Sequence, residues 1–336
     1  MSIYFLQIRF RKHPLLKPYT LNPKVINWRV PNRLLDASSS FLNWPKVDRL
    51  TGADLVFSPH FNILATAKAP RVITFHDLSF LHHPDFFSYR QRFWHWLQNF
   101  QKQAKRAAKI IAVSEFTKSD LVELLKIQPE KISVIHSGIS EEFRRLEIKD
   151  QGLKINFPYF LYLGTLEPRK NVAAIIRAFN ILKEGRQFQD YKLVLAGRPG
   201  WHYQEIFRAA AASPFQKDIL FWGPVNNQER LLLYNKAKAF IYPSFFEGFG
   251  FPPLEAQACG TPVIVANRTS LPEILGESAL YINPWRIDEL AAAMKELTTN
   301  EMLRQQLITA GLANAKRFTW QKTAEQTLNE FRQFQK

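Results

Sequence analysis

The sequence predicts an α/β protein with two doubly wound domains, each built on a parallel sheet. At 336 residues the chain is longer than a single hydrophobic core usually supports. Short apolar segments of strand length alternate with amphipathic segments of helix length along most of the chain. A charged, irregular interval at 140–156 interrupts this alternation. We therefore expect one domain over residues 1–150, a second over 151–317 and a final segment over 318–336, with the two sheets facing a common cleft.

The strands expected in the first half are short. Residues 3–10 alternate weakly and are a candidate for one strand. The interval 11–33, rich in proline and basic residues, is expected to form a loop, with a short helix within 30–42. His76 and Asp77 follow one of the strands, at the edge of the sheet where ligands gather in open α/β proteins. Together with the candidate at 3–10, the strands expected in this half cover residues 53–58, 71–75, 109–114 and 131–135, and His76 directly follows the strand at 71–75.

One long helix is expected over 86–109. Phe93, Trp96, Leu97 and Phe100 recur at helical spacing, while several arginines and lysines lie elsewhere on the helix. The apolar face either packs against the core of the first domain or contacts a membrane, with Trp and Arg at the bilayer surface.

The second half alternates more regularly. Strands are expected at 159–164, 191–197, 218–223, 239–242 and 262–266, with a further strand-like pair before residue 287. Helices are expected at 171–184, 203–212, 227–238, 287–298, 300–316 and 320–334. This order, strand then helix throughout, is typical of a Rossmann-like domain.

The stretch from 240 to 265 carries the clearest chemical signal. Glu247 and Glu255 flank a glycine-rich turn, Gly248–Gly250, that leads from a strand into a helix. Glycines allow a ligand close to the backbone, and the first N–H groups of a helix, here near Phe249 and Phe251, attract phosphate. The two carboxylates can accept hydrogen bonds from sugar hydroxyls, so the stretch fits a sugar nucleotide.

Composition limits the partners and the compartment. The net charge is +16, and the first fifty residues hold nine basic and two acidic side chains, which favours nucleic acid, phosphorylated substrates or an anionic membrane surface. The single cysteine, Cys259, excludes an internal disulfide and fits a reducing compartment. No apolar run of membrane-spanning length and no export signal is evident, so a cytoplasmic protein is expected, with peripheral contact to the inner face of the plasma membrane left open.

The glutamate pair and its flanks resemble the E-x7-E motif of retaining GT-B glycosyltransferases of family 4. The flanks agree as P-S-x-x-E-G-F-G before and E-A-x-A-C-G-T-P-V-I after. Further matching segments are L-G-T-L-E-P-R-K-N at 163–171, T-F-H-D-L at 74–78, A-V-S-E-F-T-K at 112–118 and V-I-H-S-G-I at 134–139. Together they look like bacterial mannosyltransferase-like members that build O-antigen or exopolysaccharide.

The resemblance implies a GT-B fold whose last helix packs back on the N-terminal domain. It also implies retention of anomeric configuration, no metal, and a nucleotide-sugar donor, GDP-mannose or alternatively a UDP-sugar. The acceptor would be a lipid-linked glycan or polysaccharide. The absence of any Asp-x-Asp sequence agrees with a reaction without metal.

The resemblance also implies roles for particular residues. Lys170 would hold the donor diphosphate, Glu247 the donor sugar and Glu255 the ribose hydroxyls, and His76 would lie near the transferred sugar. The remaining donor-binding residues would be Arg169, Gly197, Arg198, Gly248, Phe249 and Gly250. Many relatives carry an arginine where this chain has Thr165, which leaves the second cationic contact to be identified.

One departure concerns the start of the chain. Relatives begin with a strand, a glycine-rich loop and a helix, whereas no glycine precedes Gly52 here. A truncated relative that binds nucleotide sugar without transferring it therefore remains an alternative. A basic nucleic-acid-binding protein is a weaker one, because the basic residues do not interleave with aromatics in a recognisable module, and no nucleic-acid partner is expected.

Overall fold

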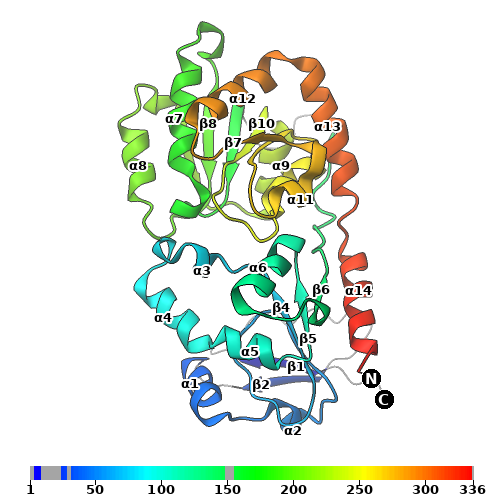
Figure 1. The fold of residues 1–336 in the computed structure, drawn as a ribbon. Coiled ribbons are helices and arrows are strands. Elements are labelled where there is room, and N and C mark those ends of the chain that lie inside the picture. Colours follow the sequence, from blue (N-terminus) through cyan, green and yellow to red (C-terminus); the bar gives the residue numbers. More distant parts are fainter. Residues whose placement is uncertain (1–3, 9–23, 29–31, 148–154, 335–336) are drawn as a thin grey trace. The chain divides into compact units, whose positions relative to one another are not determined.

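The computed structural model describes residues 4–8, 24–28, 32–147 and 155–334 (Figure 1). It contains two compact units, each an α/β arrangement around a parallel sheet, so the predicted fold class is confirmed. The first unit is made up of the chain as far as Val113, Thr117–Ile135 and the end of the chain from Gln326. The second contains Ser114–Phe116 and His136–Glu325. The units thus change over at 135/136 and at 325/326, whereas the sequence suggested 150/151 and 317/318.

The sheet of the first unit has four parallel strands in the order β3, β4, β5, β6. These strands are β3 (Val56–Ser58), β4 (Arg71–Phe75), β5 (Lys109–Ala112) and β6 (Ile132–Val134). Two further strands, β1 (Tyr4–Ile8) and β2 (Lys24–Trp28), pair in parallel with each other. Strand β2 lies in the interval expected to be a loop, so that expectation was wrong there; its Val, Ile and Trp favour a strand in spite of the flanking prolines.

The helices of the first unit are short. They are α1 (Asn32–Ala37), the π-helix η1 (Ser38–Leu42), α2 (Val47–Thr51), α3 (Ser79–His82), α4 (Tyr89–Gln98) and α5 (Phe100–Arg106), and α6 (Glu115–Leu125) begins in the second unit. Short 3-10 turns follow α3 at Pro84–Phe86 and precede β6 at Pro129–Lys131.

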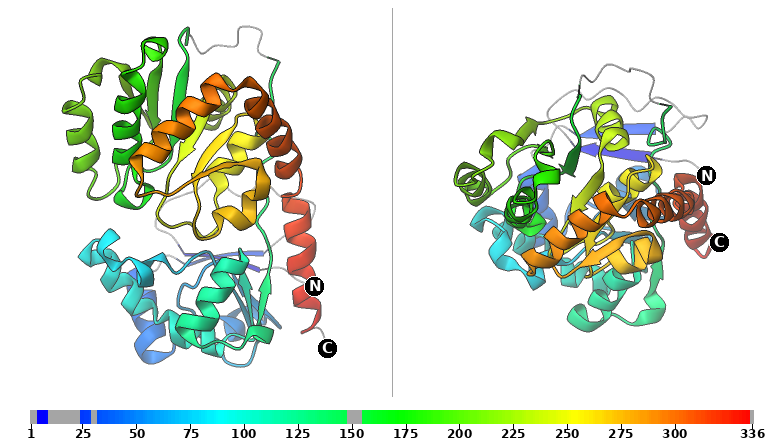
Figure 2. Two further views of the ribbon diagram at one scale, coloured as in Figure 1. Left: turned by 45° about the horizontal axis from the view of Figure 1, so that its top comes forward. Right: turned by 90° about the horizontal axis from the view of Figure 1, so that it is seen from above.

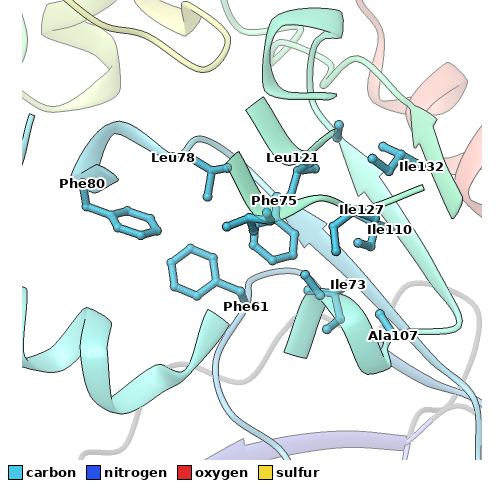
Figure 3. Close-up of a cluster of buried hydrophobic side chains, with 13 residues drawn as sticks. Phe61, Ile73, Phe75, Leu78, Phe80, Ala107, Ile110, Leu121, Ile127 and Ile132 are labelled. Atoms are coloured by element: carbon cyan, nitrogen blue, oxygen red, sulfur yellow. The ribbon is translucent and has the colours of Figure 1, made fainter. Parts of the chain in front are cut away.

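The core of the first unit forms where β4 meets the helices around it. Every residue of β4 is buried, which explains its uninterrupted β-branched and aromatic sequence. Phe61, Phe75 and Phe80 pack with Ile73 and Ile110 on one face of the sheet (Figure 3). The other face holds a smaller cluster, Val72, Ile111 and Ile135, which the apolar side chains of Phe331 and Phe334 contact.

The end of α14 (Trp320–Arg332) is fixed to the sheet of the first unit by several contacts. The rings of Phe331 and Phe57 lie 5.1 Å apart. Glu330 accepts a hydrogen bond of 2.9 Å from Ser133 Oγ and lies 3.6 Å from Lys109 Nζ. Both apolar packing and charge therefore hold this last segment against strands β3, β5 and β6.

The helix expected over 86–109 is broken. Helix α4 ends at Gln98, and α5 starts at Phe100. Asn99 between them has a left-handed backbone with φ of 44°. Asparagine tolerates this conformation better than most residues, so an asparagine at this position is a sequence signal for the break between the two helices. The core-facing assignment was wrong for Phe93 and Trp96, which are 62% and 66% exposed. Trp94 lies against the core instead.

The second unit is a six-stranded parallel sheet in the order β12, β11, β10, β7, β8, β9. Its strands are β7 (Tyr159–Leu163), β8 (Lys192–Ala196), β9 (Ile219–Gly223), β10 (Ala239–Tyr242), β11 (Val263–Ala266) and β12 (Leu280–Ile282). The chain runs from β7 to β9 on one side and then returns to place β10 on the other side of β7. The point between β7 and β10 is thus a topological switch, where loops diverge and ligands bind.

Helices cover both faces of this sheet (Figure 2). Helix α7 packs against α8 and α12, whereas α10 packs against α9 and α13. The bounds are α7 (Val172–Lys183), α8 (Gln204–Ala211), α9 (Asn227–Lys236), α10 (Phe251–Ala258), α11 (Leu271–Leu275), α12 (Ile287–Thr299) and α13 (Glu301–Ala315). The numbered strands and helices predicted for this half are present to within a few residues. Strand β12 lies in the interval where a further strand-like pair was expected, and α11 is additional.

Gly197 provides a direct test of this packing. Its φ is 142°, and a Cβ placed there would lie 1.8 Å from the carbonyl oxygen of Gly164. We expect Gly197→Ala to lower the free energy of unfolding by about 2–5 kcal/mol, because strain and overlap act together. Gly223→Ala is the matched control, since φ is 79° but nothing lies within 4 Å of its Cβ, and it should cost about 1–2 kcal/mol. If urea unfolding showed that the two variants lose the same free energy of unfolding, the close packing of Gly197 against Gly164 would be contradicted.

Candidate active site

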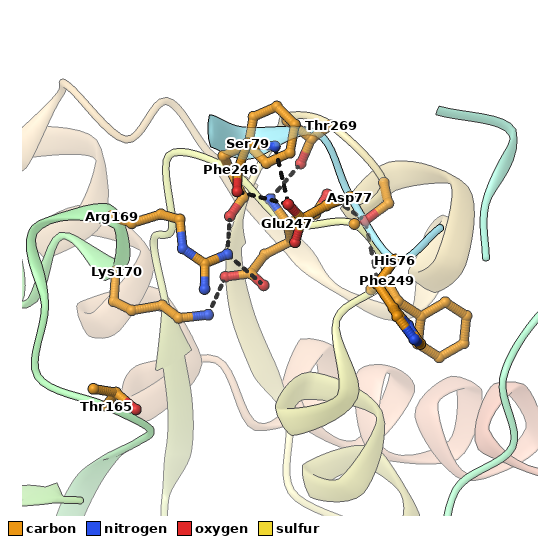
Figure 4. A network of polar contacts seen from close by, with 12 residues as sticks. His76, Asp77, Ser79, Thr165, Arg169, Lys170, Phe246, Glu247, Phe249 and Thr269 are labelled. Carbon is orange, nitrogen blue, oxygen red and sulfur yellow. Dashed lines mark hydrogen bonds and ion pairs between the residues drawn. The ribbon is translucent and has the colours of Figure 1, made fainter. Parts of the chain in front are cut away.

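The loops after β7 and β10 bring the candidate residues of the second unit together. Lys170 ends the short 3-10 turn Pro168–Lys170 that follows β7, and Glu247 lies in the loop that follows β10. Because β7 and β10 are neighbours in the sheet, both loops emerge at the same edge, at the switch point. Their side chains point toward one another (Figure 4).

Lys170 and Glu247 form a buried ion pair. The ammonium Nζ lies 2.5 Å from Glu247 Oε1 and 2.6 Å from Tyr242 Oη, and both charged residues are only 7% exposed. Burial by itself would raise the pKa of Glu247, but Lys170 and Arg169 outweigh that effect and hold the pKa below its usual value. Glu247 is therefore an ionised carboxylate at neutral pH, held by a fixed cation.

Arg169 brings a second positive charge to the same carboxylate. Its Nη1 lies 3.5 Å from Glu247 Oε2 and donates to the carbonyl oxygen of Phe246 at 3.0 Å. Its Nε donates to Glu167 Oε1 at 3.1 Å, so the guanidinium bridges two acids. Thr165, the position where many relatives have an arginine, is exposed. Arg169 thus places a second positive charge beside Lys170 and Glu247.

The loop that carries Glu247 is braced by the turn after β11. The Glu247 backbone N–H donates to Thr269 Oγ1 at 3.1 Å, and Ser270 Oγ donates to the Glu247 carbonyl at 2.9 Å. On its other side, the Phe245 N–H donates to the carbonyl of Arg169 at 2.9 Å. These contacts hold the backbone of the loop that carries Glu247 in place, as a preorganised site requires.

The glycine turn continues into α10. Gly250 has φ of 109°, and a Cβ there would lie 2.8 Å from the side chain of Leu271, so the position suits glycine alone. The Phe249 side chain is buried against Phe251 and Phe318, and its carbonyl oxygen accepts a hydrogen bond from Ser270 Oγ at 3.2 Å. The N-terminal amides of α10 start directly after this turn.

Glu255 is buried one turn into α10 and contacts α9. Its Oε2 accepts hydrogen bonds from Arg230 Nη2 and, at 3.0 Å, from Tyr234 Oη. Burial raises the pKa of Glu255, and the two partners offset only part of that shift. Neither partner was identified from the sequence, although their spacing of four residues on one helix places them on one face.

The segment after β8 approaches the segment after β7 through its backbone. The Gly164 N–H donates to Ala196 O and the Leu166 N–H donates to Arg198 O, at 3.0 and 2.9 Å. The Arg198 side chain is exposed at this edge of the sheet. Gly197 and Arg198 therefore lie at the same edge as Lys170, as an open α/β sheet predicts.

His76 and Asp77 belong to the first unit and follow β4. The His76 Nε2 lies 2.8 Å from the carbonyl oxygen of Pro59, which can only accept, so Nε2 is the donor in this hydrogen bond. The Asp77 Oδ1 accepts from the backbone N–H and hydroxyl of Ser79, at 2.9 and 2.6 Å, at the start of α3.

Within the residues that the structure describes, no group of three or more His, Cys, Asp and Glu side chains is arranged to hold a metal ion. Among the helices of this part of the chain, none has the length and apolar character needed to cross a bilayer.

Two doubly wound α/β units, with charged and glycine-rich loops at the switch point of the second, define the GT-B class of glycosyltransferases. Two family profiles match the chain. Residues 143–313 match the one described as glycosyl transferases group 1, and residues 9–143 match the one described as glycosyltransferase family 4. The chain belongs to this glycosyltransferase family.

Curated relatives agree with that assignment. The O-antigen chain mannosyltransferase B of Escherichia coli is 30% identical over 273 residues, which covers 78% of this chain and 70% of that protein. The serotype-specific mannosyltransferase WbdA of Escherichia coli is 31% identical over 236 residues, 68% of this chain but only 29% of that longer protein.

Among solved structures, sucrose-phosphate synthase from Thermosynechococcus elongatus superposes with a TM-score of 0.76. The match covers 99% of this chain and 88% of that one at 18% sequence identity. It supports the two-unit GT-B fold.

Proposed function

We propose that this chain is a retaining glycosyltransferase that needs no metal and transfers mannose from GDP-mannose to a lipid-linked glycan or polysaccharide. The observation that carries the proposal is the buried contact between Lys170 and Glu247 at the switch point of the second unit. The names of the O-antigen mannosyltransferases to which the chain is similar support mannose and a surface-polysaccharide acceptor. A UDP-sugar is the competing donor.

Lys170 is equipped to bind the donor diphosphate. An ammonium group has three N–H donors, and Glu247 and Tyr242 take two of them. The third is available to a phosphate oxygen. Arg169 adds a second positive charge, and the amides at the start of α10 add partial positive charge. Together these groups replace the divalent cation that other sugar transferases use to neutralise a diphosphate.

The proposed chemistry follows from that charge arrangement. The bond between the sugar C1 and the diphosphate oxygen breaks, its electron pair stays with the diphosphate, and the acceptor oxygen bonds to C1 on the same face. The acceptor proton moves to the departing diphosphate. Lys170 and Arg169 stabilise the negative charge that grows on the leaving oxygen, whereas Glu247 accepts hydrogen bonds from the sugar hydroxyls. His76 is assigned to the transferred sugar, and Gly197 and Arg198 to the nucleotide.

Transfer assays with the full chain test the proposal. GDP-mannose, UDP-glucose and UDP-N-acetylglucosamine would each be offered with a lipid-linked glycan acceptor and with water, and the released nucleotide measured. We expect turnover with GDP-mannose, unaffected by EDTA. Binding of the nucleotide sugar without turnover would instead favour the inactive relative, and neither binding nor turnover would contradict the donor site itself.

We further propose a cytoplasmic location with peripheral contact to an anionic membrane surface. Residues 1–156 carry 24 Lys and Arg against 13 Asp and Glu. On α4, Tyr89, Phe93 and Trp96 recur at i, i+4 and i+7 and are 87%, 62% and 66% exposed, with Arg90 and Arg92 exposed beside them. An aromatic stripe flanked by arginines suits the headgroup region of a bilayer.

Vesicle binding checks this contact. The protein should bind vesicles that contain phosphatidylglycerol and release them as salt rises. Replacing both Phe93 and Trp96 by serine should weaken binding at least about tenfold, because that apolar surface no longer enters the interface. Met302→Ser removes another apolar side chain, 85% exposed on α13, and should have no effect. The contact would be refuted if vesicle binding changed neither with salt concentration nor on replacing Phe93 and Trp96 by serine.

A further inference from the structure

The carboxylate of Glu255 has one oxygen occupied and one oxygen open. Its Oε2 accepts from both Arg230 and Tyr234. In the described part of the chain, Oε1 has no hydrogen-bond or ionic partner. A carboxylate oxygen can accept two or more hydrogen bonds, so Oε1 is the acceptor left for a ligand hydroxyl.

Arg230 donates a hydrogen bond to Glu255 while another of its own donors, Nε, lacks a partner among the described residues. Its guanidinium lies 5.0 Å above the ring of Phe143, which restricts the plane in which it can lie. Its Nε is buried and has no hydrogen-bond partner, an arrangement that is unfavourable for stability. The side chain is nevertheless only one-quarter exposed, held inward by Glu255.

Both partners come from one helix. Arg230 and Tyr234 are four residues apart on α9 and project from the same face, toward α10. The Tyr234 carbonyl also accepts from Thr261 Oγ1 at 2.5 Å, and the Tyr234 ring packs 5.3 Å from that of Phe240 on β10. Helix α9 therefore contacts both the Glu255 carboxylate and strand β10, and it holds the carboxylate in a fixed position relative to the sheet.

We propose that Arg230 is a positioning residue for ribose recognition: it holds the Glu255 carboxylate charged and turned so that Oε1 meets the 2′- and 3′-hydroxyls of the nucleotide. The inference rests on the proposed donor site. It assigns to α9 the discrimination between ribonucleotides and nucleotides that lack these hydroxyls. Without Arg230, a buried carboxylate loses both its fixed orientation and the charge that favours its ionised form.

The experiment compares GDP with 2′,3′-dideoxy-GDP by titration calorimetry on the full chain, with UDP and 2′,3′-dideoxy-UDP in parallel. The unaltered protein should prefer the ribonucleotide by about 10- to 100-fold, the range expected when hydroxyls donate to a charged acceptor. Arg230→Leu should reduce this preference to threefold or less and leave the affinity for the dideoxy form unchanged. In transfer assays the donor KM should rise with kcat preserved.

Two further variants keep the test decisive. Tyr234→Phe removes one hydrogen bond to Oε2 and should reduce the preference partly, so it reports even if Arg230→Leu does not fold. Arg177→Leu removes a matched arginine, one that pairs with Glu205 on the surface at 3.0 Å, and should leave the preference intact. An undiminished preference in Arg230→Leu, or in Tyr234→Phe where Arg230→Leu fails to fold, would overturn the inference alone. Failure of the unaltered protein to bind either diphosphate would overturn the donor site, and the inference with it.

Discussion

Replacing Lys170 by methionine is expected to lower kcat/KM for glycosyl transfer by about 10²–10³-fold or more. The substitution removes the ammonium group that faces Glu247 and, in the proposed complex, the leaving diphosphate. It also leaves the Glu247 carboxylate buried beside Arg169 alone, which should lower the free energy of unfolding by about 3–5 kcal/mol. The measurements are initial rates with the preferred donor and urea unfolding of the same preparation.

Lys183 provides the matched control. Its ammonium is fully buried and lies 2.8 Å from Asp218 Oδ2, at the other end of the second unit's helix α7. Lys183→Met should therefore destabilise the protein to a comparable degree and leave kcat/KM per folded molecule nearly unchanged. If Lys170→Met kept more than a tenth of the activity, or if both variants lost activity in proportion to stability, Lys170 would have no special part in transfer.

Replacing Glu247 by glutamine is expected to reduce kcat/KM by about 10²-fold and to destabilise the fold in a pH-dependent way. The folded state holds the pKa of Glu247 below its usual value of 4.5, since Lys170 and Arg169 outweigh burial. A lowered folded-state pKa means that the ionised carboxylate contributes stability above the unfolded pKa. That contribution is lost as the pH falls through the folded pKa. The unaltered protein should therefore have the higher free energy of unfolding at pH 7. Its difference from Glu247→Gln should shrink as the pH falls below about 4.5.

Glu205 serves as the control for Glu247. It pairs with Arg177 on the surface, and its side chain is 65% exposed, so Glu205→Gln should change stability by less than about 0.5 kcal/mol at any pH. Urea unfolding between pH 4 and pH 8 gives both profiles. A gap for Glu247→Gln that stayed constant or widened on acidification would contradict the ion pair as described.

The strongest predictions from sequence concerned residues whose chemistry depends on local order along the chain. The glycine turn and the flanking acids can be recognised because strand, loop and helix follow one another within 26 residues. The resemblance implied only that Lys170 and Glu247 serve the same donor, whereas their direct contact was found in the structure. It depends on β7 and β10 being neighbours, a pairing that the strand–helix alternation alone does not specify.

Arg230 and Tyr234 were missed for a physical reason. Both lie on a helix that reads as an ordinary amphipathic one, and a buried arginine has the same sequence signal as an exposed one. Their importance comes from the packing of α9 against α10, which brings them to Glu255 across 25 and 21 positions of sequence. The same limitation applies to the contact between Asp77 and Ser79: the two residues are only two positions apart, but they meet because α3 begins there.

In helix α4 the helical periodicity of the sequence is correct, but the face that it predicts to be buried is exposed. Phe93 and Trp96 share a helical face, but the side chains that pack inward are on the opposite side, where Trp94 contacts the core and Gln98 accepts from the Ile63 backbone N–H at 2.6 Å. Hydrophobic periodicity assumes that the more apolar face is the buried one. Here the buried face includes polar groups that satisfy backbone donors, and the apolar stripe remains exposed.

The central claim is that Lys170, beside Glu247, binds the diphosphate of a nucleotide sugar. Titration of GDP and of guanosine into the protein and into Lys170→Met tests it most directly, with UDP and uridine as the second pair. We predict that the unaltered protein binds the diphosphate at least about 100-fold more tightly than the nucleoside, and that Lys170→Met loses most of this difference while binding the nucleoside equally well. The same difference in both proteins would contradict the claim.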